Sequence, residues 1–185
     1  MKLENEIAAD GVDPLLLKYT ICYIRHNDSL LLLNRKSPPV MGLWHGVGGK
    51  IEAGESPADS VLREVLEETG IHLDHVRDRG KVTWTTLGGT SGGMYAFLAD
   101  FPGHLDPQAY ITPRETDEGI LDWKPIGWVL DPQNNGIPQH ARYYLPQLLE
   151  DGPSAYEYCC TFKDGNLIDY SAVPLIAQWT ASSRE

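Results

Sequence analysis

The most constraining feature of this sequence is an acidic cluster at residues 63–68, REVLEE. On an α-helix, Glu64 lies beside Glu67 and Glu68, which follow it by three and four residues, so the three carboxylates project from one face. The other side of the helix carries Val61, Leu62, Val65, Leu66 and Thr69. The pattern predicts an amphipathic helix with an acidic stripe facing outward and an apolar stripe packed on a core.

The acidic stripe needs a physical reason, because like charges at this spacing destabilise a bare helix by about 0.2–0.5 kcal/mol per pair. A divalent cation would reverse that cost. Mg²⁺ takes oxygen ligands and favours carboxylates combined with the phosphates of a substrate. The alternative is a solvated acidic face without a ligand, and the residues that flank the helix favour the cation.

The flanking residues give the helix well-marked ends. Ser56 is a good N-cap, Pro57 suits the first helical position, and Asp59 suits the first turn. Gly70 can adopt the left-handed conformation that ends many helices. The glycine-rich residues 46–50 (GVGGK) precede the helix and allow a tight turn or a close approach of the backbone to a ligand. Loop and helix together predict a site for a metal-bound phosphate.

This spacing resembles the signature of the Nudix hydrolase family, Gly-x5-Glu-x7-Arg-Glu-U-x-Glu-Glu-x-Gly-U, in which U is a bulky aliphatic residue. The chain matches every fixed position, with Gly49, Glu55, Arg63, Glu64, Val65, Glu67, Glu68, Gly70 and Ile71. So many fixed positions make the match highly specific. The resemblance implies an enzyme that hydrolyses a nucleoside diphosphate linked to another group, with Mg²⁺ as cofactor and Mn²⁺ as a substitute.

The resemblance also assigns roles within the signature. It implies that Glu64, Glu67 and Glu68 are catalytic metal ligands, and that Glu64 is a candidate for handling the nucleophilic water. Arg63 is expected to orient the carboxylates through charge-assisted hydrogen bonds rather than to contact the substrate. Glu55 either braces the loop or joins the metal ligands.

Further metal ligands are expected outside the acidic helix. The backbone carbonyl of Gly48 or Gly49 is one candidate. The family often adds a carboxylate from beyond the signature. Residues 115–123 (ETDEGILDW) resemble the stretch that precedes a late strand in MutT-type members, which places Glu118 at that position. The alternative for Glu118 is an exposed acid in a loop.

Several residues near the glycine loop are candidates for substrate binding. Arg35 stands at a predicted strand end directly before this loop, where it suits phosphate binding; the alternative is a solubilising surface charge. Gly49 and Lys50 belong to the loop that is expected to hold the phosphates. His45 precedes the glycines, near the expected mouth of the nucleotide site, although a lone histidine is more often structural.

The resemblance to MutT-type members that act on oxidised purine nucleoside triphosphates extends beyond the signature, over residues 31–50, 138–149 and 164–170. The chain departs from these members in the expected base pocket. His45 replaces an asparagine, and Gln139 and His140 replace two adjacent acids that read the oxidised base. Glutamine and neutral histidine can each donate or accept a hydrogen bond. The substitutions therefore predict a base pocket of low selectivity.

Apolar, β-rich runs predict strands at residues 15–25, 30–34, 81–87, 94–101, 120–129, 155–163 and 167–172. Residues 88–93 (GGTSGG) are expected to form a flexible hairpin loop, and a short helix is expected from Pro138 toward Glu150, interrupted by Pro146. This order of elements suits an α+β fold. It agrees with the Nudix-type α/β/α sandwich, in which a mixed β-sheet lies between helices.

The composition limits the class of partner. Of the 185 residues, 42% are hydrophobic and 22% are charged, which suits a single globular domain over residues 1–185 with a loose lead-in at residues 1–14. The net charge of −11 argues against a surface for duplex nucleic acid, which needs a basic footprint. The expected partner is a small nucleotide substrate, whose phosphates require a metal and local cations.

The same composition bears on the compartment. The N-terminal residues MKLENEIAAD are unlike a signal peptide, and no apolar run is long enough to cross a bilayer, so no membrane partner is expected. Cys22 and the adjacent Cys159 and Cys160 lack the spacing of a metal site. They suggest buried or half-buried thiols in a reducing, cytoplasmic environment.

Two functions from different classes are consistent with these features. The first is a hydrolase acting on nucleoside triphosphates or related diphosphates, including oxidised dGTP. The second is a nucleotide-sensing domain that binds its ligand without catalysis. The intact signature favours the hydrolase, because a sensing module of this family typically has a broken signature or a fused DNA-binding domain.

Overall fold

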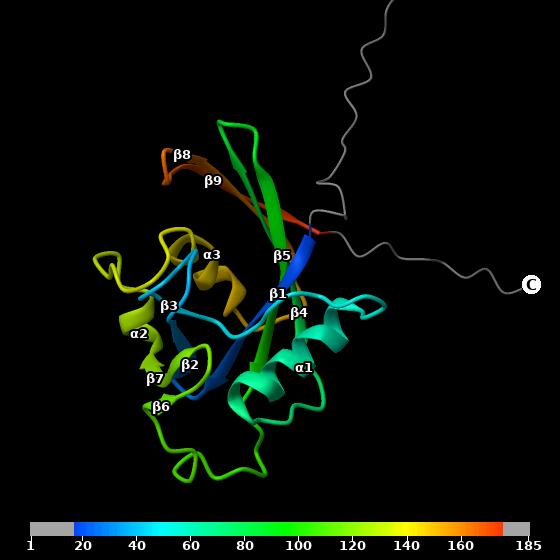
Figure 1. The fold of residues 1–185 in the computed structure, drawn as a ribbon, viewed down its shortest axis with the longest axis vertical. Coiled ribbons are helices and arrows are strands. Elements are labelled where there is room, and N and C mark those ends of the chain that lie inside the picture. The colour runs from blue at the N-terminus through cyan, green and yellow to red at the C-terminus, as the bar shows by residue number, and fades with distance from the viewer. Residues whose placement is uncertain (1–16, 176–185) are drawn as a thin grey trace, which may run out of the picture.

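The computed structural model describes residues 17–175, so the lead-in expected at residues 1–14 lies outside the described part. Its elements are β1 (Leu17–His26), β2 (Ser29–Arg35), β3 (Trp44–His45), α1 (Pro57–Thr69), β4 (Arg77–Thr86), β5 (Ser91–Asp100), β6 (Arg114–Glu115), β7 (Gly119–Pro125), α2 (Ile126–Val129), α3 (Ala141–Leu148), β8 (Tyr156–Lys163) and β9 (Asn166–Pro174). The strands form one sheet in the order β6-β7-β2-β1-β5-β4-β8-β9, and β3 pairs with β2 (Figure 1).

The sheet is mixed, as expected. β1 pairs with β5 in parallel, and β4 pairs with β8 in parallel, while the remaining neighbours are antiparallel.

The predicted hairpins, one near each end of the described residues, are confirmed. Asn27 turns β1 into β2 with φ +50°, and Asp164 and Gly165 turn β8 into β9 with φ +51° and +78°. Asparagine, aspartate and glycine tolerate this left-handed backbone better than other residues.

Both faces of the sheet are covered because its central strands are apolar on both sides. On one face, Ile21, Tyr23, Leu30 and Leu32 are buried together with residues of α3. On the other face, Cys22, Ile24, Leu31 and Leu33 are buried with Val61 and Val65 of α1. Successive side chains of a strand point to opposite faces, so a continuous apolar run fills two cores. The α/β/α sandwich is therefore confirmed.

Helix α1 begins and ends where its capping residues predict. The Ser56 hydroxyl accepts a hydrogen bond from the Asp59 N–H at 3.1 Å, and Gly70 closes the helix with φ +74°. The expected apolar stripe is too wide in one respect: Leu66 is 45% exposed. One residue corresponds to about 100° of rotation, which carries Leu66 away from the sheet while its neighbour Val65 stays buried.

Three other expectations about secondary structure are wrong. The strand expected at 120–129 ends at Pro125, and residues 126–129 form α2 instead, since proline has no N–H to donate to the sheet. Residues 91–93 of the expected loop belong to β5, because they pair with β4, and a Cβ at Gly92 would lie 2.7 Å from Nε1 of Trp84 on that strand. The helix expected from Pro138 begins at Ala141 and continues through Pro146 to Leu148.

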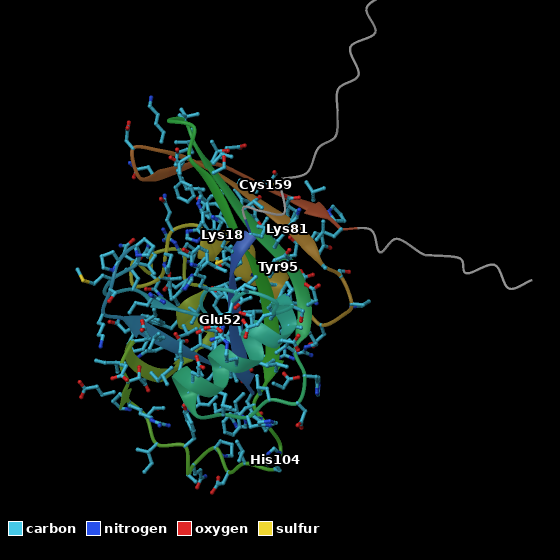
Figure 2. All side chains as sticks on the ribbon, turned by 45° about the vertical axis from the view of Figure 1, so that its right-hand side comes forward. Lys18, Glu52, Lys81, Tyr95, His104 and Cys159 are labelled. Carbon is cyan, nitrogen blue, oxygen red and sulfur yellow. The ribbon has the colours of Figure 1, made fainter. Side chains whose placement is uncertain are left out.

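The helices do not cover the whole sheet. Figure 2 shows Lys81, Tyr95 and Cys159 above α1, and His104 at the far end of the molecule, in the loop after β5.

The thiols of Cys22 and Cys160 are buried and that of Cys159 is half-buried, in agreement with the sequence. No helix within residues 17–175 is long and apolar enough to span a membrane.

Candidate active site

A cleft of about 1100 Å³ contains most of the residues that the sequence predicts for the site. Its walls come from β1, the glycine loop at residues 46–50, α1, the turn that precedes β7, and the β8–β9 hairpin. Glu64, Glu67 and Glu68 of α1 line it together with Glu118 and Arg35. The fold therefore brings two distant segments, the acidic helix and the turn at residue 118, into one cleft.

The glycine loop runs along the backbone of β1, which explains its small residues. The Cys22 N–H donates to the Val47 carbonyl at 2.7 Å, and the Thr20 N–H donates to the Gly49 carbonyl at 2.8 Å. A Cβ at Gly48 would overlap the Thr20 carbonyl, and Gly48 itself has φ +145°. The close backbone approach that the sequence predicts is therefore, at Gly48, an approach to strand β1 of the protein itself.

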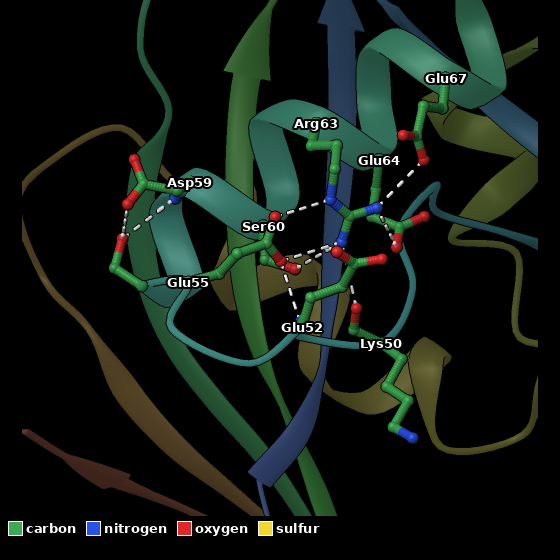
Figure 3. A network of polar contacts seen from close by, with 9 residues as sticks. Lys50, Glu52, Glu55, Asp59, Ser60, Arg63, Glu64 and Glu67 are labelled. Carbon is green, nitrogen blue, oxygen red and sulfur yellow. Dashed lines mark hydrogen bonds and ion pairs between the residues drawn. The ribbon is translucent and has the colours of Figure 1, made fainter.

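Gly49 approaches a different group. A Cβ at this position would overlap the Glu64 carboxylate. The Gly49 carbonyl, one of the two carbonyls expected as metal ligands, accepts the Thr20 hydrogen bond. The Lys50 side chain is exposed and directed away from Arg63, while its backbone carbonyl accepts a hydrogen bond from Arg63 at 3.2 Å (Figure 3).

Arg63 is the centre of the polar network on α1 (Figure 3). Its guanidinium donates to Glu55 at 2.7 and 3.0 Å, to Glu64 at 2.9 Å and to Glu67 at 3.0 Å. The pairing with Arg63 lowers the pKa of Glu55 to about 2, and a third hydrogen bond reaches Glu55 from the Glu52 N–H. The Glu55 carboxylate is thus bonded both to the loop and to Arg63, and the same guanidinium donates to Glu64 and Glu67, two carboxylates that line the cleft.

Glu68 is the least solvated of the helix carboxylates. Burial raises its pKa to about 7, although the Gly48 N–H donates to Oε2 at 2.9 Å and favours the charged form. Burial also raises the pKa of Glu64, and the Arg63 guanidinium opposes that shift. A carboxylate that is partly removed from water and has other carboxylates nearby is poorly stabilised until a cation arrives.

The donors of the cleft fit a hard divalent ion. Within residues 17–175, no three acidic, imidazole or thiol side chains already converge at metal-ligand distances. Glu64 and Glu67 instead direct oxygens toward Arg63. Mg²⁺ normally keeps several waters and uses only one or two carboxylates together with substrate phosphates. The cleft thus carries carboxylates of the kind that this ion uses, without three of them already gathered around one point among the described residues.

Arg35 faces the acidic groups from β2. Its Nη2 lies 3.8 Å from Oε2 of Glu118, an ion-pair distance longer than a hydrogen bond, and its buried Nε has no hydrogen-bond partner among the described residues. The guanidinium therefore retains capacity to bind further oxygen atoms. The turn that carries Glu118 is held by the Thr116 hydroxyl, which accepts from the Glu118 N–H at 3.2 Å.

The three residues expected in the base pocket also line the cleft. Burial lowers the pKa of His45 to about 3 and that of His140 to about 4, so both imidazoles are neutral near pH 7. The Nε2 atom of His45 is buried without a partner among the described residues. Oε1 of Gln139 accepts a hydrogen bond from the Leu167 N–H at 3.0 Å, so this amide offers mainly its NH₂ donors to a ligand.

The sequence analysis missed the apolar wall of the cleft. Trp84, Met94 and Phe162 line it from β4, β5 and β8. No local motif marks these residues, because each looks like an ordinary inward-facing residue of a strand. Only the pairing of β4 with β5 and β8 places them together. They give one part of the cleft a large aromatic and apolar surface.

Gly49 provides a test of this geometry. We expect Gly49→Ala to lower kcat/KM about 10- to 100-fold, because the new methyl group displaces the Glu64 carboxylate and small misplacements are costly in catalysis. Steady-state kinetics with urea unfolding as a check of the fold would measure this. Gly103→Ala is the matched control, since no heavy atom lies within 4 Å of its added Cβ. Equal kinetics for both variants would contradict the packing of Gly49 against Glu64.

Comparison with known proteins identifies the family. The family model described as the NUDIX domain matches residues 16–147. The chain belongs to the Nudix hydrolase family. Nudix hydrolases act on pyrophosphate bonds of nucleoside diphosphate derivatives, which makes this chain a hydrolase of phosphorus-containing acid anhydrides, and members generally need a divalent metal ion, usually Mg²⁺.

Individual relatives place the chain near the MutT-type Nudix proteins. It is 34% identical to the uncharacterised Nudix hydrolase YvcI of Bacillus subtilis, over 60% of this chain and 67% of that protein. It is 27% identical to the oxidised purine nucleoside triphosphate hydrolase of Mus musculus, over 78% of this chain and 85% of that protein. The crystal structure of a MutT protein from Bacillus halodurans superposes with a TM-score of 0.64 at 27% identity, over 83% of this chain and 95% of that one.

A longer relative matches this chain over less than half of its own length. The NAD-capped RNA hydrolase NudC of Vibrio parahaemolyticus is 37% identical over 61% of this chain, but the match spans only 42% of that protein. The shared part therefore supports the Nudix domain and leaves the rest of NudC unmatched.

Proposed function

We propose that this Nudix hydrolase uses Mg²⁺, or Mn²⁺ as a substitute, to cleave the pyrophosphate linkage of nucleoside triphosphates or other nucleoside diphosphate compounds, with oxidised purine nucleotides among its substrates. The supporting observation is the single cleft in which Glu64, Glu67, Glu68 and Glu118 face Arg35 and the glycine loop. Oxygen donors for a cation and a guanidinium for phosphate thus lie in one place.

The proposed roles follow from the contacts of each side chain. Glu68 is the principal metal ligand, because its carboxylate is partly removed from water and its hydrogen bond comes from the Gly48 N–H, and Glu67, Glu118 and the Gly48 carbonyl complete the oxygen donors. Glu64 orients the attacking water with one oxygen while Arg63 holds the other oxygen. A bound Mg²⁺ would neutralise phosphate oxygens and lower the pKa of a bound water.

The remaining groups of the cleft are proposed to bind the nucleotide. Arg35 binds a phosphate through the guanidinium hydrogens that Glu118 leaves free. Gly49 and Lys50 lie along the same part of the cleft and contact the phosphate chain. The base lies against the apolar wall, within reach of His45, Gln139 and His140.

A panel of nucleotides would test this proposal. The purified chain is incubated with Mg²⁺ and (d)NTPs, oxidised dGTP, ADP-ribose, dinucleoside polyphosphates or NAD-capped RNA, and the products are resolved by ion-exchange chromatography. We expect cleavage of a pyrophosphate bond, with nucleoside monophosphate among the products. Binding of nucleotides without any product would support the sensing function and contradict the proposal.

The base pocket leads to a prediction about selectivity. We expect kcat/KM for oxidised dGTP to exceed that for dGTP by at most about tenfold, roughly 1.4 kcal/mol. The physical reason is that neutral His45, neutral His140 and the Gln139 amide do not provide the pair of acids that would reject the wrong base by remaining unpaired. Competition of both nucleotides in one reaction measures the ratio. A preference of several hundredfold would show that other residues read the lesion.

A further inference from the structure

One contact connects the acidic helix to the turn that carries Glu118. The Thr69 carbonyl, one residue after Glu68, accepts a hydrogen bond from Arg114 Nη1 at 3.1 Å and another from the Tyr110 hydroxyl at 2.9 Å. The last turn of α1 contains no basic residue of its own. The guanidinium of Arg114 therefore supplies the positive charge that stabilises the negative end of the helix dipole.

The backbone of Arg114 is rigidly tied to Glu118. Arg114 lies in β6 and pairs with Leu121 of β7, and the Thr116 N–H donates to the Gly119 carbonyl at 2.8 Å within the connecting turn. Glu118 lies inside this tight hairpin. The backbone of Glu118 is also bonded to the segment after β2, because the Glu118 carbonyl accepts a hydrogen bond from the Lys36 N–H at 3.1 Å.

We propose that Arg114 is a positioning residue that sets the separation between the carboxylates of α1 and the carboxylate of Glu118. Its side chain holds one end of the helix, and its backbone holds the hairpin. This inference rests on the proposed role of Glu118 as a metal ligand. Arg114 does not line the cleft, so it acts on the bound cation only through Glu118 and α1. Groups that orient metal ligands typically change metal affinity about 10- to 100-fold when they are removed.

The test compares Mn²⁺ dissociation constants without nucleotide, measured by electron paramagnetic resonance, for the full chain and its variants. We expect Arg114→Gln to raise the dissociation constant about tenfold. Tyr110→Phe is the matched control: it removes the other hydrogen bond to the same carbonyl and keeps the ring that lies 5.9 Å from the Arg114 guanidinium. It should change the constant by less than about twofold while lowering stability by the usual cost of a hydrogen bond. Urea unfolding in EDTA verifies that each variant is folded.

A double variant separates positioning from helix capping. Glu118→Gln should itself weaken Mn²⁺ binding, and adding Arg114→Gln to it should cause little further change, because the group that Arg114 positions is already lost. Equal effects of Arg114→Gln and Tyr110→Phe on Mn²⁺ binding would reduce Arg114 to a helix cap and overturn the inference, as would an Arg114→Gln variant with the parent affinity. An unchanged affinity in Glu118→Gln would instead remove Glu118 from the proposed metal site, and the inference with it.

Discussion

Turnover of any nucleotide substrate by this chain should fall by at least about a thousandfold when divalent cations are removed, since a metal ion at a phosphoryl group contributes several kcal/mol to the transition state. Among the described residues, the wall of the cleft carries carboxylates for the cation and two side chains that are positively charged near pH 7, Arg35 and Lys50. The positive charges of these two side chains cannot offset the negative charges of both the acidic wall and a bound polyphosphate. Initial rates are measured in EDTA and again after addition of Mg²⁺ or Mn²⁺, which should restore them.

Urea unfolding in EDTA is the control for this experiment, because it shows whether the chain stays folded without the ion. Both hydrophobic cores are built from apolar side chains that lie away from the acidic face of α1, so the chain should still unfold cooperatively in urea when EDTA is present. Undiminished turnover in EDTA would refute metal dependence. Loss of turnover together with unfolding would show that the ion acts on the fold rather than on the phosphate.

Replacement of Glu68 by glutamine should also produce a large loss of activity, somewhat smaller than that caused by removing the metal. The substitution preserves shape but removes the charge that the cation needs, and we expect kcat/KM to fall by about 100- to 1,000-fold, as when one group that stabilises a transition-state charge is removed. The metal-free fold should not lose stability. It should gain up to about 1 kcal/mol near pH 8, because burial disfavours the ionised Glu68 and glutamine carries no charge.

Glu64→Gln should show a similar loss of activity for a different reason. Its carboxylate is proposed to orient the water, and an amide cannot accept a proton from that water. Glu150→Gln serves as the control for both variants, because Glu150 is an exposed acid after α3 that lies outside the cleft. A Glu68→Gln enzyme with a near-parent rate at saturating Mg²⁺ would show that the ligand assignment is incorrect.

The sequence predicts the acidic helix well because its determinants are local. Ser56 and Gly70 cap α1, and the spacing of Glu64, Glu67 and Glu68 places them on one face, whatever the remainder of the chain does. The error at Leu66 has a different cause. Periodicity counts apolar residues, but the burial of each one depends on which part of the helix faces the sheet, and Leu66 lies about 100° around the helix from the buried Val65.

The missing parts of the cleft depend on contacts between distant segments. Trp84 and Phe162 are far apart in sequence and become neighbours only because β4 pairs with β8 in parallel, which a pattern within one strand does not encode. In the sequence Gly92 looks like a loop residue, because the group that leaves no room for a side chain there is the Trp84 indole on the adjacent strand. Arg114 is similar: nothing near it in the sequence indicates that its partner is the end of α1.

The position of the cation is the most direct test of the account. A crystal grown with Mn²⁺ and a non-hydrolysable nucleotide would reveal the ion by its anomalous scattering. We predict a peak in the cleft within about 2.0–2.4 Å of an oxygen of Glu68 and of a substrate phosphate, since hard cations of this size bind oxygen at such distances. Glu64 or Glu118 should lie beside it. A nucleotide bound in the cleft with no peak near Glu68, or with the ion held elsewhere, would contradict the proposal that the acidic face of α1 exists to bind a catalytic metal.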